Sequence, residues 1–129
     1  MKSIIGRTIK ETFSNINDGL LKSQSEVKEI TEKSGTSYTL TLQNTDDVIC
    51  ITSETASIVI IPENNNVPFP VKTVITIIQT GSGSVTISGN SPIVLNAYNN
   101  NLSIVGQYAA IQLIKKDINT WIVIGGTSL

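Results

Sequence analysis

The hydrophobic pattern of this chain changes its period near Gly35, and this change constrains the fold more than any other feature of the sequence. Before it, apolar residues recur at alternating spacings of three and four, with one interruption at Ser23. After it come short β-branched runs separated by turn residues. The first part therefore predicts an α-helix with a narrow apolar stripe, and the second part predicts β-structure. The stripe consists of Ile9, Phe13, Ile16, Leu20, Val27 and Ile30.

A stripe this narrow is typical of a coiled coil, because a helix that packs on its own domain has a wider apolar face. We therefore expect a helix from about residue 8 to 33 that associates with copies of itself through the stripe, as a trimer or a dimer. Thr8 and Glu11 fit a capping box at its start, and Gly35 fits its end. Gly19, Ser23 and the stretch of residues 14–18 have modest or poor helix propensity and weaken the helix, so two shorter helices on the surface of the β-domain are the alternative.

Charge is concentrated in the first quarter of the chain. Residues 1–36 hold 11 of the 19 charged side chains, and the formal net charge is -1. A balanced charge leaves no electrostatic footprint for nucleic acid, and the charge-poor remainder favours association. The N-terminus has no signal-peptide pattern and no apolar run is long enough to cross a membrane, so we expect synthesis in the cytoplasm without membrane insertion. The predicted domains are residues 1–36, the attachment segment and helix, and residues 37–129, the β head.

Nine short apolar runs follow residue 36, with turn residues between them. This spacing predicts an antiparallel β-sandwich, a barrel or a trimeric β-prism-like head. Residues 58–61 and 121–124 are apolar on both faces, so either a neighbouring subunit or the second layer of an ordinary sandwich covers their second face. Cys50, the only cysteine, and Trp121 both lie in such runs, and we expect them in the core.

The sequence contains no histidine, which removes the commonest general base and the commonest neutral metal ligand. Asp46 and Asp47 lie in a turn-rich stretch, where we interpret them as turn formers rather than as metal ligands or a catalytic pair. Glu54 and Glu63 are single carboxylates and are expected to be solvated. The Gly-Ser-Gly segment at residues 81–83 precedes a strand-like run, so a hairpin turn fits it better than a phosphate loop. We expect no enzymatic activity, no metal and no cofactor.

Two asparagine-rich turns with tyrosines nearby are candidates for a ligand-binding tip, since amide and aromatic groups suit contacts with sugars or proteins. Asparagine is also a common turn former that tolerates φ > 0, so a purely conformational role is the simpler interpretation. The candidate residues are Asn64, Asn65, Tyr98, Asn99 and Asn100.

Several segments of the β part resemble a β-domain of bacteriophage virion proteins, especially tail fibres, tailspikes and related surface appendages. The resemblance covers residues 37 to 125, and Lys72 stands where the family often has glycine before its long strand. It implies a non-enzymatic virion component that is usually homotrimeric. The segments are Ser37-Tyr38-Thr39-Leu40, Ile61-Pro62-Glu63-Asn64, Pro68-Phe69-Pro70-Val71-Lys72-Thr73 with the long run that follows it to Ile87, Leu102-Ser103-Ile104-Val105-Gly106-Gln107-Tyr108-Ala109-Ala110, and Asn119-Thr120-Trp121.

The predicted helix and the resemblance together suggest a short homotrimeric fibre or capsid decoration protein, whose partners are its own copies and larger virion proteins. Residues 1–7 precede the helix, and Ile4 and Ile5 have nothing local to pack on. We therefore expect Ile4, Ile5 and Arg7 to attach the chain to the particle. The alternative is an adhesin module that recognises a host-surface glycan or protein. A small glycan-processing enzyme is disfavoured, because convincing paired carboxylates and histidine are missing.

Overall fold

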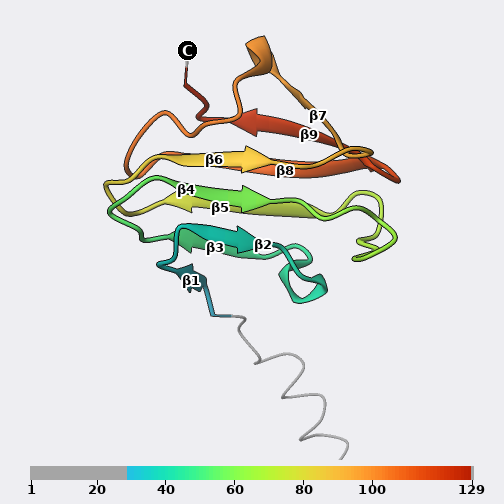
Figure 1. Ribbon diagram of the computed structural model, residues 1–129, viewed down its shortest axis with the longest axis horizontal. Helices are drawn as coiled ribbons and strands as arrows, with labels where there is room; N and C mark the ends of the chain where they lie inside the picture. The colour runs from blue at the N-terminus through green and yellow to red at the C-terminus, as the bar shows by residue number, and fades with distance from the viewer. Residues whose placement is uncertain (1–28, 129) are drawn as a thin grey trace, which may run out of the picture.

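Nine strands and two short 3₁₀ turns make up the fold of residues 29–128, the part of the chain that the computed structural model describes (Figure 1). The prediction of a mainly β fold is confirmed. The strands are β1 (Thr31–Lys33), β2 (Ser37–Thr39), β3 (Val48–Ile51), β4 (Ser57–Ile60), β5 (Val74–Gln79), β6 (Val85–Ser88), β7 (Val94–Ala97), β8 (Ala110–Asp117) and β9 (Thr120–Gly125), and the 3₁₀ turns are η1 (Leu42–Asn44) and η2 (Tyr98–Asn100).

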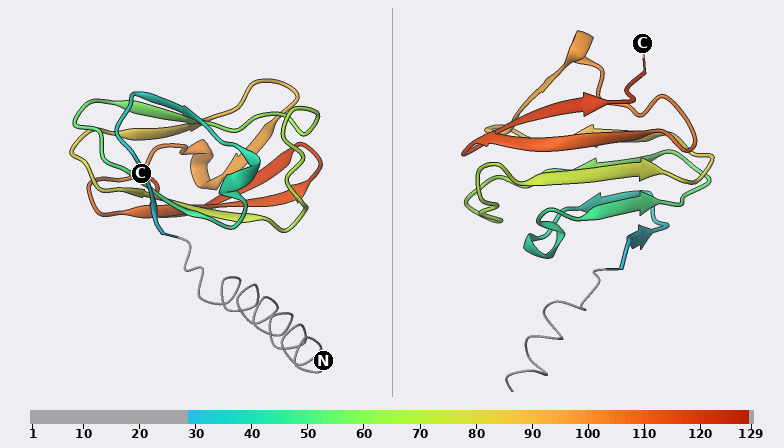
Figure 2. Two further views of the ribbon diagram at one scale, coloured as in Figure 1. Left: turned by 90° about the horizontal axis from the view of Figure 1, so that it is seen from below. Right: turned by 180° about the vertical axis from the view of Figure 1, so that it is seen from behind.

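The chain alternates between two facing sheets as it runs from β1 to β6. Strands β1, β3 and β5 belong to a six-stranded sheet of order β1-β3-β5-β8-β9-β7, called here the large sheet. Strands β2, β4 and β6 form a three-stranded sheet, called here the small sheet. Figure 2 (left) shows the two sheets as opposite layers. The first six strands therefore form three stacked coils, and each coil pairs with the next one in both sheets.

The predicted antiparallel pairing is wrong for most of this two-layer structure. Among the named strands, only the ladders β5–β8 and β8–β9 are antiparallel, and the other five are parallel. The alternation of apolar and polar residues shows which face of a strand is buried, but it is the same for either strand direction. Because the turns were interpreted as hairpins, the direction was inferred wrongly.

The Gly-Ser-Gly segment at residues 81–83 illustrates the error, because it joins two strands that lie in opposite sheets and the hairpin prediction is therefore wrong. This turn stacks on the turn of the preceding coil. The backbone N–H of Gly81 donates to Ile51 O and that of Gly83 donates to Ser53 O, each at 3.0 Å. A Cβ at Gly83 would lie 2.1 Å from Thr55 O, so close stacking of the two turns requires glycine.

Strand β1 lies where the sequence predicted the end of the helix and the first domain. Residues 31–33 pair in parallel with β3, so a helix continuing to residue 33 is wrong for this segment. The side chain of Thr31 also donates to Asp47 Oδ2 at 2.7 Å, which holds β1 against the turn before β3. Ile30 is 56% exposed and precedes the strand. The other positions of the predicted stripe, Ile9, Phe13, Ile16, Leu20 and Val27, lie outside the described residues.

The core fills the space between the two sheets. Trp121 is 1% exposed, and its ring meets that of Phe69 edge to face with 5.5 Å between centroids, which confirms the prediction that Trp121 is a core residue. Cys50 is also buried, but it alternates with Ile49 and Ile51 and therefore faces outward from the large sheet, beside Glu32 of β1. Burial, and secondarily the charge of Glu32, raises the pKa of this thiol.

The two edges of the sandwich differ. At the upper edge in Figure 1, the C-terminal segment crosses toward the small sheet, where Ser128 N donates to Ser103 O at 2.9 Å and Ile104 bridges Thr127. At the lower edge, β1 and β2 each pair with one strand among residues 29–128. At the top, isolated bridges and the C-terminal segment thus link the two sheets, whereas at the bottom β1 follows directly from the N-terminal part of the chain. Within residues 29–128, no helix has the length and apolar character needed to span a membrane.

Candidate functional site

The asparagine-rich turns predicted as a binding tip lie in different places. Asn64 and Asn65 belong to the loop between β4 and β5, whereas Tyr98, Asn99 and Asn100 form η2 between β7 and β8. In Figure 1 the orange turn of η2 stands at the top of the molecule, and the loop after β4 lies at its side. The structure therefore does not bring the two groups together into one tip.

Asn64 has an internal structural role. Its side-chain oxygen accepts a hydrogen bond of 2.5 Å from Lys115 Nζ, and its backbone N–H donates to Asn119 Oδ1 at 2.8 Å. Lys115 is 2% exposed and also donates to Phe69 O at 2.7 Å, while its ammonium lies 6.0 Å from the centroid of the Trp121 ring. Burial lowers the pKa of this lysine. Asn64 therefore helps to solvate the buried ammonium of Lys115, which in turn holds the loop between β4 and β5 in place.

The residues of η2 combine exposure with a conformational role. Asn99 and Asn100 have φ values of 55° and 56°, in the left-handed region that asparagine tolerates better than most residues. Tyr98 is 76% exposed, and Asn65 is exposed in its own loop. The left-handed angles favour the interpretation of Asn99 and Asn100 as turn formers, whereas the ring of Tyr98 is exposed.

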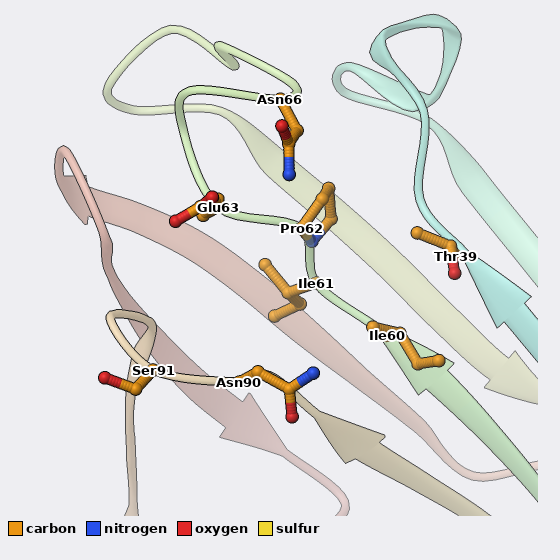
Figure 3. A pocket seen from close by; sticks show the side chains of 8 residues that line it. All are labelled: Thr39, Ile60, Ile61, Pro62, Glu63, Asn66, Asn90 and Ser91. Carbon is orange, nitrogen blue, oxygen red and sulfur yellow. The ribbon is translucent and has the colours of Figure 1, made fainter.

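A polar hollow of about 280 Å³ lies instead at the carboxyl ends of the three parallel strands of the small sheet. Parallel strands end at the same edge of a sheet, so the segments that follow β2, β4 and β6 meet there. Figure 3 shows the Asn66 side chain directed toward Pro62 and the Asn90 side chain extended toward Ile60. The residues that line the hollow are Thr39, Ile60, Ile61, Pro62, Glu63, Asn66, Asn90 and Ser91.

The polar side chains of the hollow are available to a ligand. Among the described residues, the side chains of Thr39, Glu63, Asn66, Asn90 and Ser91 make no hydrogen bond to protein. They offer hydroxyl, amide and carboxylate groups around the apolar surface of Ile60 and Pro62, a combination suited to a polyhydroxylated molecule. Glu63 is the only carboxylate of the hollow, so the two carboxyl groups used in most glycoside hydrolysis are not present in it.

Sequence reasoning identified Glu63 only as a solvated residue and missed the other polar residues of the hollow. The available signal was weak: a polar residue or turn follows each of the apolar runs that became β2, β4 and β6. It would have identified the hollow only if those three runs had been recognised as parallel neighbours, because only then do their carboxyl ends coincide.

Asp46 and Asp47 are engaged in the fold, as expected for turn formers. Asp46 has a φ of 55° and its Oδ1 accepts a hydrogen bond of 2.8 Å from Val74 N. Asp47 accepts from Val48 N at 2.9 Å and from Asn44 Nδ2 at 3.2 Å, in addition to Thr31. Within residues 29–128, no group of three or more His, Cys, Asp or Glu side chains is placed to hold a metal ion.

Asp47 and Thr31 also line a second hollow, of about 370 Å³, near the lower edge of the sandwich. Its contacts are structural: Tyr38 donates to Asn44 Oδ1 at 2.8 Å, and Lys33 Nζ lies 4.7 Å from the centroid of the Tyr38 ring. The remaining residues of its lining are Glu29 and Gln43.

The fold and these surfaces define a small, mainly β protein of stacked, largely parallel coils with a polar hollow at one end of its small sheet. Searches with models of protein families and with curated protein sequences give no match for this chain.

Proposed function

We propose that this chain is a non-enzymatic structural protein of a bacteriophage virion. In this proposal it is a short homotrimeric fibre or decoration protein, anchored to the tail or capsid by its N-terminal segment and displaying the β-domain. The observation that carries the proposal is the conformation of the turn before β5, because this turn lies in one of the segments of the resemblance.

The turn spans residues 70–73. Thr73 N donates to Pro70 O at 3.1 Å, and Lys72, the third residue, has a φ of 81°. A hydrogen bond of this kind with a positive φ at the third position alone is typical of a type II turn, which favours glycine there. The resembling virion domains often have glycine at this position. Lys72 therefore has a conformation that favours glycine, at the position where the resemblance leads us to expect glycine.

Two segments of the resemblance also meet in space. Phe69 comes from the segment before β5 and Trp121 from the closing segment, and their rings form the edge-to-face pair of the core. Lys115 joins the same cluster by donating to Phe69 O. These contacts support the resemblance, because they give its scattered residues one shared structural role.

The test of this proposal is incorporation into particles. A chain lacking residues 1–7 should form the same trimer in solution as the full chain, measured by light scattering, but should be missing from phage particles purified after expression in an infected host. The full-length chain is the positive control. Normal incorporation of the shortened chain would rule out N-terminal anchoring, and a full-length monomer would rule out the trimer.

The second candidate function is a receptor-binding module, which the free polar side chains of the hollow favour. Purified protein should then bind isolated envelope polysaccharide of the host, and Asn66→Ala should weaken binding because it removes an amide from the hollow. Asn65→Ala is the matched control, since Asn65 is an exposed neighbour outside the lining. Equal loss in both variants, or no binding by the parent protein, would count against this function.

A further inference from the structure

The outer faces of the two sheets differ in chemistry. On the large sheet, residues that alternate with the core point outward in aligned rows, such as Val74, Ile114 and Ile122 on β5, β8 and β9. Most of these outward residues are aliphatic, and Ile124 and Val94 are 45% and 49% exposed. The apolar residues of this large-sheet face are Val48, Cys50, Val74, Ile78, Val94, Ala110, Ile114, Ile122 and Ile124.

The small sheet has a mixed outer face. Ser37, Ile58 and Thr86 form one outward row across its three strands, and Thr39, Ile60 and Ser88 form the next. Each of the two isoleucines therefore lies between two hydroxyl-bearing residues, and a mixed surface of this kind is stable in water. Ile58 is 45% exposed, the same fraction as Ile124 on the opposite layer.

Among the described residues, the charges of the large-sheet face lie at its margins, on Glu32 of β1 and on Lys116 and Asp117 at the end of β8. Its other outward polar residues, including Thr76, Gln112 and Asn96, are neutral. A wide apolar surface without interspersed charge is unusual for a free surface of a small protein and marks an interaction site.

We infer that the large-sheet face is the surface through which copies of this chain pack against one another. The inference deepens the proposed function and rests on its homomeric assembly. In a cyclic oligomer, residues near the axis meet their own counterparts, so any charge there would face a like charge. A face that is neutral across its centre suits self-association, whereas a different partner would commonly be selected by complementary charges.

The dimensions of the face are sufficient for such contact. With strands about 4.8 Å apart and about 3.3 Å of rise per residue, six strands of this length present a plane of roughly 400–500 Å². Two such faces in contact would bury roughly 800–1,000 Å² in total, the size range of a weak interface.

The N-terminal sequence also indicates that the large-sheet face is covered by another copy of this chain. Residues 9–30 carry the apolar stripe that predicts self-association, and Thr31 immediately begins β1, an edge strand of the large sheet. Association through the stripe would bring the β1 edges of neighbouring copies close together. The large sheets are then the layers best placed to meet.

Thiol reactivity in the full-length chain tests the inference. In a Cys50→Ala background, the single variants Ile124→Cys and Ile58→Cys place one thiol on the large or the small sheet, at positions of equal exposure in the isolated chain. In the assembled protein we expect the Ile124→Cys thiol to be alkylated at least about tenfold more slowly than the Ile58→Cys thiol, because thiol reactivity depends on access. Circular dichroism and light scattering of both variants verify fold and mass.

The outcomes separate the two proposals. An oligomer with selective protection of the Ile124→Cys thiol supports both the assembly and its interface. An oligomer in which both thiols react equally fast overturns the inference about the large-sheet face and leaves the homotrimer standing. A monomer with equal reactivity overturns both. Ile124→Lys provides a second measurement: it should raise the dissociation constant of the oligomer about tenfold or more, whereas Ile58→Lys should not change it.

Discussion

Lys72 occupies a backbone conformation that favours glycine. Its φ of 81° costs a residue with a Cβ about 1 kcal/mol relative to an unstrained conformation. The turn persists because Thr73 is buried, while the N–H of Lys72 donates to Lys115 O at 2.8 Å and ties the turn to β8. The strain is therefore local and is held by contacts on both sides of the residue.

Lys72→Gly should stabilise the protein by about 0.5–1 kcal/mol, since glycine adopts this angle without strain but loses more chain entropy on folding. Urea unfolding followed by circular dichroism measures the change. Lys72→Ala is the control, because alanine removes the charge and keeps the strained angle, and it should give no gain. A gain of equal size in both variants would assign the effect to the charge.

Because of Lys115, the free energy of unfolding should vary with pH in the alkaline range. Burial lowers its pKa in the folded state, so in the window between that value and the ordinary lysine pKa the unfolded chain binds more protons than the folded one. The free energy of unfolding should therefore rise with pH through this window, and this contribution is lost as the pH falls. Urea unfolding at several pH values above 7 should show the rise in the parent protein and its absence in Lys115→Met. Parallel pH curves for the two proteins would contradict the assignment.

At the scale of elements, the fold depends on the stacking of equivalent turns. The Gly-Ser-Gly turn between β5 and β6 lies on the turn between β3 and β4, and the two are joined by backbone hydrogen bonds. Because a Cβ at Gly83 would overlap Thr55 backbone atoms, Gly83→Ala should destabilise the protein by about 3 kcal/mol. Gly106→Ala is the control, since nothing lies within 4 Å of its Cβ position. Thermal unfolding of the two variants measures the difference, and equal midpoints would show that the turns can separate cheaply.

The sequence was informative about the strands themselves and not about their partners. Most of the predicted apolar runs became strands, because β-branched residues and period-two alternation are local signals. Residues 102–105 formed only isolated bridges, and β1 was missed because Thr31-Glu32-Lys33 contains no apolar residue. The pairing of Ile51 with Gln79 joins residues 28 positions apart, and nothing in either run encodes its direction.

The candidate site shows the same limit at finer detail. Asn64 and Asn66 stand two positions apart in one asparagine run and are equivalent as sequence signals. In the structure, one bonds a buried lysine and the other lines the polar hollow. Their roles differ because Asn64 contacts Lys115 and Asn66 shares the hollow with Asn90, and both of these partners are distant in sequence. Composition was enough to predict a polar loop, but only the tertiary contacts distinguish the roles of the individual asparagines.

At the scale of the whole molecule, the β-domain contains its own core. Among the described residues, a large hydrophobic cluster that runs from Leu40 to Val123 joins the two sheets. A chain of residues 29–129 should therefore fold cooperatively, with a single transition by circular dichroism and by tryptophan fluorescence, which reports on buried Trp121. A broad transition, or an exposed tryptophan spectrum at low temperature, would show that the N-terminal residues are needed for folding.

The stacking of coils has a consequence for how such a protein can change in length over evolution. The steps from β3 to β5 and from β4 to β6 are both 28 residues, so one complete coil begins and ends in matching register. Duplication of such a segment would insert a new layer between existing ones, and the strands at the lower and upper edges of the sandwich would keep their present positions as edges. Each duplication would lengthen the domain by about 4.8 Å along the stacking direction. The length of the domain would therefore be set by the number of repeats that the gene encodes.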